Sequence, residues 1–276
     1  MQVEADIQPM ISQPVQSNWF IRGTATQCRV IGATILRELH TRFGRENIGY
    51  LWFLVDPMLL ATGITVVHLL VLRSMQDGLE VGPFYITGYC GYMIFRANVN
   101  RAPSIIDSNR TLLFHKNVTL VDLVLARCVL EAMAVLMAMY ILLAATTAAS
   151  LGHLPDRPLL IFAGVGLMFW LTTALAMILC ALSEFTTMPE RLTHPITYLI
   201  IPISGMFYRI EWMPEVVRKY LGWFPVPQII ELIREGEWSG LSSSYLNVPY
   251  LVGCCAVLTL LGLLGLGIAR RRMHFS

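Results

Sequence analysis

The chain has 276 residues, of which 55% are hydrophobic and only 14% are charged, and its mean hydropathy is +0.60. This hydropathy lies far outside the range of soluble globular domains, so the composition excludes that class and indicates an integral membrane protein. The formal net charge of +2 is less informative, because in a membrane chain the position of each charge matters more than the total.

The N-terminal segment is polar. Residues 1–18 are rich in Gln and lack the apolar stretch of a signal peptide. We therefore expect residues 1–30 to form a loosely ordered cytoplasmic tail.

Residues 31–46 follow a helical amphipathic pattern. One face of this helix would carry Ile31, Ile35, Leu36, Leu39 and Phe43, and the opposite face Arg37, Thr41 and Arg45, with Arg42 near a boundary. Such a pattern predicts an interface helix with its apolar face toward acyl chains. The helix either anchors the first span or presents its basic face to headgroups or a partner.

Six segments qualify, though unequally, as spans of a bilayer core of ~30 Å, which needs about 20 apolar helical residues. They are 50–72, 84–99, 120–150, 159–182, 195–208 and 248–268. The fifth is short, rich in proline and the weakest of the set. Lys and Arg concentrate before the first span, between the second and third, and in residues 269–276. Because positive loops stay in the cytoplasm, both termini are predicted to be cytoplasmic.

Residues 103–113 are predicted to form a short cytoplasmic helix. Pro103 lies near its start, and Ser104 and Asp107 have capping-box spacing. Thr119 and Asp122 have the same spacing at the start of the third span. A short helix between spans can receive force from a soluble partner or can merely separate two spans, and the pattern leaves both readings open.

Ionisable residues occur at membrane depth, where they are costly. Arg127 and Glu131 have i,i+4 spacing in the third span, and Asp122 is close enough to join a local network. We expect satisfied pairs near a helix end for these three residues. Asp56 precedes Pro57 in the first span, which favours a hinge or a contact between subunits.

Residues 209–247 are the longest connection. Two amphipathic runs, 214–224 and 228–237, are separated by Pro225 and Pro227, and neither reaches spanning length. This pattern predicts a re-entrant helical hairpin on the periplasmic side. The tryptophans of this segment either lie at the membrane interface or offer faces on which sugar rings stack; they are Trp212, Trp223 and Trp238.

The sequence lacks several common motifs of nucleotide-binding, catalytic and metal-binding sites. It contains no GxxxxGK[ST] phosphate loop, no HExxH and no GxSxG, and its six cysteines lack metal-ligand spacing. We therefore expect no cofactor, metal or nucleic acid on this chain, and a membrane subunit that takes its energy from elsewhere. An integral membrane enzyme of lipid or glycan assembly, using Asp122, Arg127 and Glu131, is the alternative.

Three segments resemble, in order, the signature regions of ABC-2 type permeases. They are "RELHTRFGRENIGYLWFLVDPMLL", "NVTLVDLVLARCVLE" and "IPISGMFYRIEWMPEVVRKYLGWFPVPQIIELIREG". Phe224 stands where the family has Asn, and Gln228 where it has His. Among such permeases, the compact length and six spans are most similar to group 2 capsular polysaccharide exporters of Gram-negative bacteria.

The resemblance implies an all-α integral membrane fold in the bacterial inner membrane. It implies a homodimer that works with two copies of a separate ATPase, which would bind ATP and Mg. The substrate would be a lipid-linked acidic polysaccharide, passed to a periplasmic co-polymerase adaptor and an outer-membrane channel. O-antigen and teichoic acid exporters share this architecture and are the near alternatives.

Site roles follow from the resemblance combined with the placement of residues. Because a polar polymer cannot cross hydrocarbon unaided, the dimer is expected to enclose a water-containing canal. The residues predicted to couple this chain to the ATPase are Arg37, Glu38, Arg42, Arg45, Ser104, Ile105, Asp107, Ser108 and Asn109. Those predicted to line the canal or gate its periplasmic mouth are Tyr50, Trp52, Tyr208, Arg209, Trp212 and Trp223. The predicted intramembrane polar network consists of Asp56, Asp122, Arg127 and Glu131.

Overall fold

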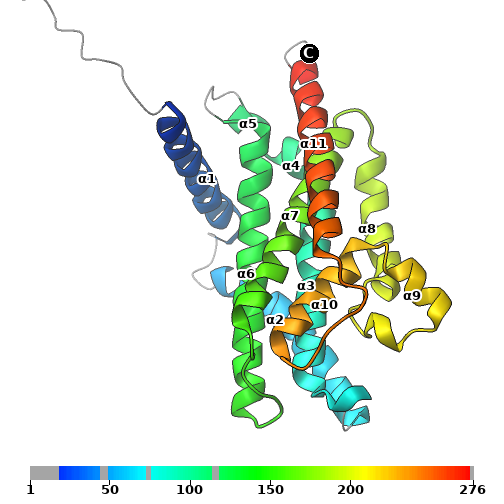
Figure 1. Cartoon of the computed structure of the whole chain (residues 1–276). Coiled ribbons are helices and arrows are strands. Elements are labelled where there is room, and N and C mark those ends of the chain that lie inside the picture. Colours follow the sequence, from blue (N-terminus) through cyan, green and yellow to red (C-terminus); the bar gives the residue numbers. More distant parts are fainter. Residues whose placement is uncertain (1–18, 44–48, 73–75, 114–117, 274–276) are drawn as a thin grey trace, which may run out of the picture.

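The computed structural model describes residues 19–43, 49–72, 76–113 and 118–273, and in these ranges it contains helices and connections but no strands (Figure 1). The longer helices are α1 (Trp19–Phe43), α2 (Gly49–Val71), α3 (Val81–Arg101), α6 (Leu120–Ala148), α7 (Pro158–Ser183), α8 (Met188–Ile200), α10 (Pro225–Glu237) and α11 (Val248–Met273). The shorter ones are η1 (Gln76–Gly78), η2 (Ala102–Ser104), α4 (Ile105–Ser108), α5 (Arg110–Leu113), η3 (Ile201–Ile203), η4 (Ile210–Trp212) and α9 (Glu215–Leu221). The all-helical prediction is confirmed.

Four of the described helices are long and apolar enough to cross a membrane. The apolar windows are Leu54–Val71, Leu120–Ala148, Pro158–Ser183 and Val248–Arg272. They coincide with the first, third, fourth and sixth predicted spans. The last helix continues to Met273, beyond the predicted end at residue 268.

Helix α3, which covers the second predicted span, is long enough to cross but less apolar. Its 21 residues extend about 31 Å at 1.5 Å per residue. Most of its side chains are buried, because α2, α6, α7 and α10 all pack against it. A helix enclosed by protein does not need a lipid-compatible surface, which explains the Gly, Tyr and Asn residues in its sequence.

The fifth predicted span has different boundaries from those expected. Helix α8 begins at Met188, with Pro189 in its first turn, and ends at Ile200. Proline is accepted in a first turn because the N–H groups there have no acceptor within the helix. Beyond η3 the chain turns at Gly205, whose φ is +76°, so the predicted span 195–208 is wrong at both ends.

Helix α10 is wedged between α3 and α7. The two predicted helices are present as α9 and α10, but the break between them lies at residues 222–224, and Pro225 and Pro227 occupy the first turn of α10, where proline is accepted as at Pro189. The fit is close: a Cβ added to Gly88 of α3 would lie 2.3 Å from the main-chain oxygen of Met206, beside the Arg234 guanidinium of α10. A Cβ on Gly164 of α7 would lie 2.7 Å from Ile233 of α10.

Helix α1 leans against α6 at the end of the molecule where α4, α5 and the C-terminal end of α11 also lie (Figure 1). It begins at Trp19, so the prediction of a tail up to residue 30 is wrong for residues 19–30. The residues of the expected apolar face differ in exposure. Ile31, Ile35 and Leu39 are half-buried, whereas Leu36 is 59% exposed.

Candidate functional site

An interhelical polar network joins α1 to the start of α6. The Arg127 guanidinium of α6 forms an ion pair with the Glu38 carboxylate of α1, and both side chains are largely buried. Nearer the start of each helix, Gln27 Nε2 donates to Asp122 Oδ1 at 2.9 Å. Helix α1 is therefore held to α6 by two polar contacts as well as by apolar packing.

The capping box predicted at the start of α6 is confirmed. Thr119 N donates to Asp122 Oδ2 at 3.0 Å, and Asp122 N donates to Thr119 Oγ1 at 3.2 Å. The Asp122 carboxylate thus fixes the first turn of α6 with one oxygen and holds Gln27 with the other. This single side chain links local helix capping to the docking of α1.

Glu131 also has its ion-pair partner on another helix. Its Oε1 lies 2.5 Å from Arg101 Nη1 at the end of α3. The expected local network along α6 is therefore replaced by pairs that connect α6 to α1 and to α3. A pair across two packed helices holds their positions, whereas an exposed i,i+4 pair contributes only about 0.2–0.5 kcal/mol.

The segment predicted as one helix over 103–113 consists of η2, α4 and α5 in direct continuation of α3. Ser104 and Asp107 do not form a capping box: Ser104 Oγ donates to the Arg101 oxygen at 3.0 Å, and Asp107 pairs with Arg110 at 3.0 Å. The chain departs from helical geometry at Asn109, where φ is −124°. The predicted single helix is therefore a series of short turns.

Only some of the predicted coupling residues face outward. Ser104, Asp107 and Ser108 are exposed, whereas Ile105 and Asn109 are buried. Asn109 Nδ2 donates to the Ile105 oxygen at 3.1 Å, and Asn109 Oδ1 accepts from Arg37 Nη1 at 3.3 Å. Arg37 and Asn109 therefore join α1 to this segment; Asn109 is buried, whereas Arg37 is itself exposed.

The remaining predicted residues at this end are only partly described. Arg42 and Tyr50 lie in helices, but their side chains fall outside the described part of the structure, and Arg45 lies outside the described residues. Trp52 and Asp56 are exposed on α2. Asp56 is thus separate from the network that joins Asp122, Arg127 and Glu131 to other helices.

A second set of buried charges, which the sequence analysis missed, surrounds α10. Arg234 is fully buried and donates to the main-chain oxygens of Gly205 at 2.9 Å, Met206 at 2.8 Å and Tyr208 at 2.8 Å. Its guanidinium lies 3.9 Å from the centroid of the Phe84 ring of α3. Arg234 therefore clamps the turn after α8 against α3.

Arg209 is surrounded by carboxylates. Its guanidinium lies 3.4 Å from Glu231, 3.2 Å from Asp77 and 3.0 Å from Glu211, and its side chain is 4% exposed. Trp212 shares this cluster, since its Nε1 donates to Asp77 Oδ2 at 2.9 Å. Arg209, which was predicted to line the canal or gate its periplasmic mouth, is therefore buried with its charge neutralised by carboxylates of the same chain.

A third polar cluster lies where α10 ends, next to the start of α3 and the connection between α6 and α7. His153 Nδ1 lies 3.1 Å from Glu80 Oε1, and His153 Nε2 lies 3.1 Å from the main-chain oxygen of Glu237. Trp238 Nε1 donates to Glu80 Oε2 at 2.7 Å. All of these groups lie outside the four apolar windows.

The Glu237 side chain is the unusual member of this cluster. It is fully buried, and neither carboxylate oxygen has a hydrogen-bond partner within the described residues. Burial raises the pKa of Glu237 to about 7, against the opposing attraction of His153. The hydrogen bond to the Glu237 main-chain oxygen and the nearby Glu80 carboxylate raise the pKa of His153, although burial opposes this.

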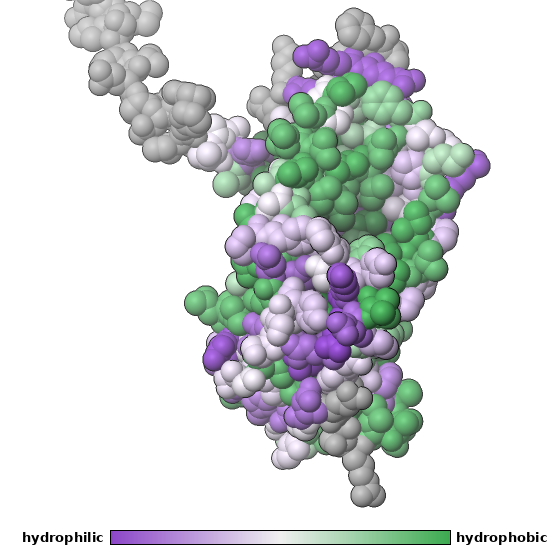
Figure 2. Space-filling view, turned by 45° about the vertical axis from the view of Figure 1, so that its right-hand side comes forward, coloured by the Kyte–Doolittle hydropathy of each residue, from purple (hydrophilic) through white to green (hydrophobic). Residues whose placement is uncertain are grey.

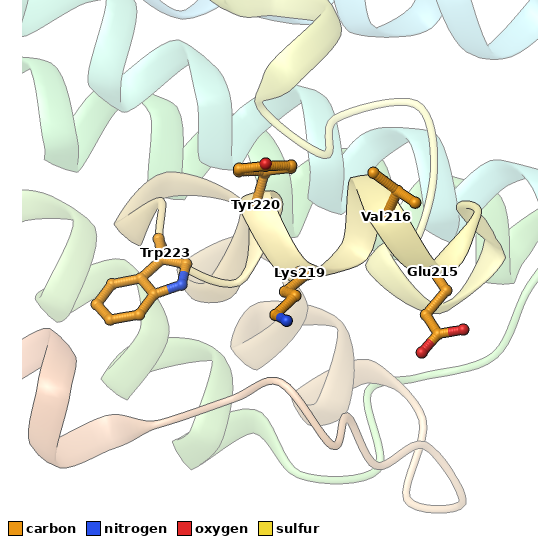
Figure 3. Close-up of a pocket in the computed structure, with 5 residues that line it drawn as sticks. All are labelled: Glu215, Val216, Lys219, Tyr220 and Trp223. Atoms are coloured by element: carbon orange, nitrogen blue, oxygen red, sulfur yellow. The ribbon is translucent and has the colours of Figure 1, made fainter.

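Helix α9 presents an exposed aromatic surface. Tyr220 and Trp223 are 69% and 70% exposed and border a shallow cavity of about 440 Å³ together with Glu215, Val216 and Lys219. In Figure 3 the Tyr220 and Val216 side chains leave one side of α9, and Lys219 and Glu215 leave the other. Trp223 is thus accessible, as both an interfacial position and a stacking face for sugar rings require. The hydroxyl of Tyr208, another predicted canal residue, donates to the Pro202 oxygen at 2.9 Å.

Residues in α10 were missed for a traceable reason. The run from Gln228 to Glu237 is amphipathic, and a polar face of this kind usually faces solvent. In the structure the polar residues face protein, where Glu231, Arg234 and Glu237 are buried at i,i+3 spacing. The i,i+3 spacing shows from the sequence that these three residues share one face, but it does not show that the face is buried.

Comparison with known proteins identifies the family. A model of the ABC-2 type transporter family matches residues 29–238. The capsule polysaccharide export inner-membrane protein CtrC of Neisseria meningitidis is 32% identical over 244 residues, which cover 88% of this chain and 92% of CtrC. BexB of Haemophilus influenzae, with the same description, is 30% identical over equal shares, and the polysialic acid transport protein KpsM of Escherichia coli is 29% identical over 91% of this chain and 96% of KpsM. The extent of the family match, the helical fold and the identity to CtrC together establish that the chain belongs to the ABC-2 type transporter family.

Proposed function

We propose that this chain is the permease subunit of an ATP-driven exporter that moves lipid-linked capsular polysaccharide across the bacterial inner membrane. The observation that supports this most strongly is the similarity, over about nine-tenths of the chain, to proteins named for capsule polysaccharide export. The sequence contains no phosphate loop, so ATP and Mg would be bound by a separate ATPase subunit.

The proposed topology has six passes with both termini in the cytoplasm. In it α3 is the second pass, α8 begins the fifth, and α10 is a re-entrant helix entered from the periplasm. The charge distribution supports this orientation, because Arg101, Arg110 and residues 270–272 gather at the end where α4, α5 and the end of α11 lie. α8 and η3 together would extend about 26 Å, close to the thickness of the hydrocarbon core.

The proposed working unit is a homodimer that encloses a hydrated canal. Only 17% of the apolar window of α2 is buried within one chain, compared with 56% for α6 and α7. Its exposed face therefore suits a contact with a second copy, and Tyr50 and Trp52 would lie at the cytoplasmic entrance. The proposed exit leads past α9, where Tyr220 and Trp223 offer stacking faces for sugars, toward a periplasmic adaptor and an outer-membrane channel.

Coupling to the ATPase would use α1 and the η2–α4 turn as one unit. The contacts Arg37–Asn109 and Glu38–Arg127 connect α1 both to this turn and to α6. A force applied by the ATPase to the exposed residues Ser104, Asp107 and Ser108 would thus reach three helices at once. This arrangement favours a coupling role over a simple membrane anchor.

Co-purification with the ATPase tests the proposal. The wild-type chain is expected to bring down a stoichiometric ATPase whose turnover depends on it, and cells lacking the chain are expected to lose surface polysaccharide. A lone chain that neither binds an ATPase nor is needed for surface polysaccharide would exclude an exporter. An O-antigen or teichoic acid substrate would instead appear as loss of that polymer.

A matched pair of variants tests the ATPase-coupling role of the η2–α4 turn separately from the proposal that the chain is an exporter. Ser108→Trp adds a bulky group to the exposed η2–α4 turn, and Thr187→Trp adds the same group to the exposed turn before α8. We expect the first variant to lose ATPase binding and export while the second retains both. Full retention by Ser108→Trp would remove the coupling role but leave the transport proposal intact.

A further inference from the structure

An apolar groove runs between α3, α7 and α8. It has a volume of about 440 Å³, within the range of roughly 300–1,000 Å³ that small ligands occupy. The walls are formed by Phe95 and Val99 of α3, Leu179 and Leu182 of α7, and Leu192 and Ile196 of α8. Figure 2 shows this face: its upper half is mostly green and is hollowed between α11 and α8.

The length of the groove matches one leaflet of a bilayer. Its lining residues on α8 extend from Met188 to Ile200, which corresponds to about 18 Å along a helix. Half of a hydrocarbon core of ~30 Å is about 15 Å. The groove begins at the end of the bundle where α4 and α5 lie. In the topology proposed above, it would reach from the cytoplasmic surface to about mid-membrane, as a single acyl chain of one leaflet does.

Positive charge lies at one end of the groove. The Arg272 guanidinium lies 5.2 Å from the centroid of the Phe185 ring, and the next residue, Thr186, lines the groove. Arg191 is exposed beside Leu192, and Arg270 is exposed beside Arg271. These arginines outnumber the two carboxylates nearby, Glu184 and Glu190, so this end has an excess of positive charge. Figure 2 shows hydrophilic residues, in purple, above the green surface.

We propose that the groove binds one acyl chain of an anionic phospholipid from the inner leaflet, with the lipid phosphate near Arg191 and Arg272. An anionic phospholipid fits this site because the apolar groove can take its acyl chain and the arginines at the end of the groove can bind its phosphate. The acyl chain separates α8 from α7 and so sets the position of α8. The inference requires a membrane-embedded chain but not polysaccharide export, so either proposal can fail alone.

Photo-crosslinking tests this site in the full complex. The chain and its co-purified ATPase are placed in nanodiscs containing phosphatidylglycerol with a diazirine in mid-chain, and the labelled peptides are mapped. We expect label on the groove residues of α7 and α8. Leu179→Trp, which fills the groove, should reduce this label about tenfold. Leu264→Trp, on the exposed face of α11, should leave it unchanged.

The headgroup is tested with matched lipids. Phosphatidylcholine carrying the same chain should label the groove several-fold less, and Arg191→Gln combined with Arg272→Gln should abolish the difference. Ile196→Trp, at a more exposed groove position, provides a second blocking variant in case Leu179→Trp lowers the Tm.

Three results would overturn the proposal. Equal labelling of the groove and of the exposed leucines of α11 would mean ordinary lipid contact. Absence of lipid together with loss of the dimer in both blocking variants would assign the groove to a second copy of the chain. The third result is groove labelling in complexes from cells that cannot make the polymer, but none in complexes from polymer-producing cells. In that case the groove would bind the lipid end of the exported substrate, which would exclude the labelled phospholipid.

Discussion

At the scale of single residues, the buried positions around α10 leave little space. Arg234 donates to three main-chain oxygens of one turn, and the Gly88 position lies against the same turn. Leaving a buried carbonyl without its hydrogen-bond donor lowers the free energy of unfolding by about 1–3 kcal/mol. The turn at residues 205–208 and helix α10 therefore stabilise each other. The positions of α3, α10 and residues 205–208 are thus fixed together.

Replacing Gly88 tests this close packing. The methyl group of Gly88→Ala would lie 2.3 Å from a main-chain oxygen, which requires α3 or the turn to shift. We expect a loss of about 1–3 kcal/mol, seen as a lower Tm of the purified protein in detergent. Gly63→Ala in α2 is the matched control, because nothing lies within 4 Å of its added methyl. Equal Tm values for the two variants would contradict the packing argument.

Glu237 predicts a pH dependence of stability. The pKa of this carboxyl rises from its ordinary value of 4.5 to about 7 on folding, so the folded chain binds an extra proton between these values. The free energy of unfolding therefore falls as pH rises through this interval, and the raised pKa of His153 acts in the same direction above its ordinary value of 6.5. The lowered pKa of Glu80 acts oppositely, but below its ordinary value of 4.5.

We expect Glu237→Gln to raise the Tm at about pH 8 and to change it little at about pH 5. The measurement is a series of thermal unfolding curves across that range in one detergent. Glu215→Gln on the exposed face of α9 should keep the wild-type slope. An unchanged slope in Glu237→Gln would assign the pH dependence to other groups.

At the scale of helices, one ion pair and one hydrogen bond determine how α1 packs on α6. The Glu38–Arg127 pair and the Gln27–Asp122 hydrogen bond lie on the same side of α1, about three turns apart. Because α1 has few fully buried residues, these polar contacts give its position most of its specificity.

Charge reversal tests the pair. Glu38→Arg or Arg127→Glu alone places two like charges together in a largely buried site, and each should cost about 3–5 kcal/mol at that contact and release α1 from α6. The double variant restores opposite charges and should recover most of the loss. Limited proteolysis within α1 reads out the release. Identical protection in all three variants would show that the pair does not hold the helix.

The sequence predicted the helices and their local caps better than the contacts between helices. The Thr119–Asp122 capping box was predictable because both partners belong to one turn. The partners of Arg127 and Glu131 were not, because they come from helices far away along the chain. Likewise, composition alone does not distinguish α3 and α10 from weak membrane segments, since their polar residues are satisfied only by tertiary contacts.

At the scale of the whole molecule, the proposed topology places the connections between helices on two opposite sides of the membrane. The η2–α4 turn lies at one end, and residues 239–247 belong to the other side in the six-pass proposal. Ser108 and Ser242 are exposed at these places and provide a matched pair of reporters.

In a chain whose native cysteines are replaced by serine, a membrane-impermeant maleimide should label Ser242→Cys in intact cells. Ser108→Cys should react only after the inner membrane is opened. Both sites accept a small side chain, so expression of the two variants should be equal. Labelling of both in intact cells, or of Ser108→Cys alone, would overturn the proposed orientation.

The enclosure of α10 also constrains the order of biogenesis. The Arg234 guanidinium of α10 is fully buried, donates to main-chain oxygens of the turn at Gly205 and lies over the Phe84 ring of α3, and such a charge is costly in bare lipid. We therefore expect α3 and the turn at Gly205 to be in the bilayer already when α10 enters. On this basis α10 is expected to enter the membrane late, between helices already in place, and not by lateral release into lipid as an independent hydrophobic helix.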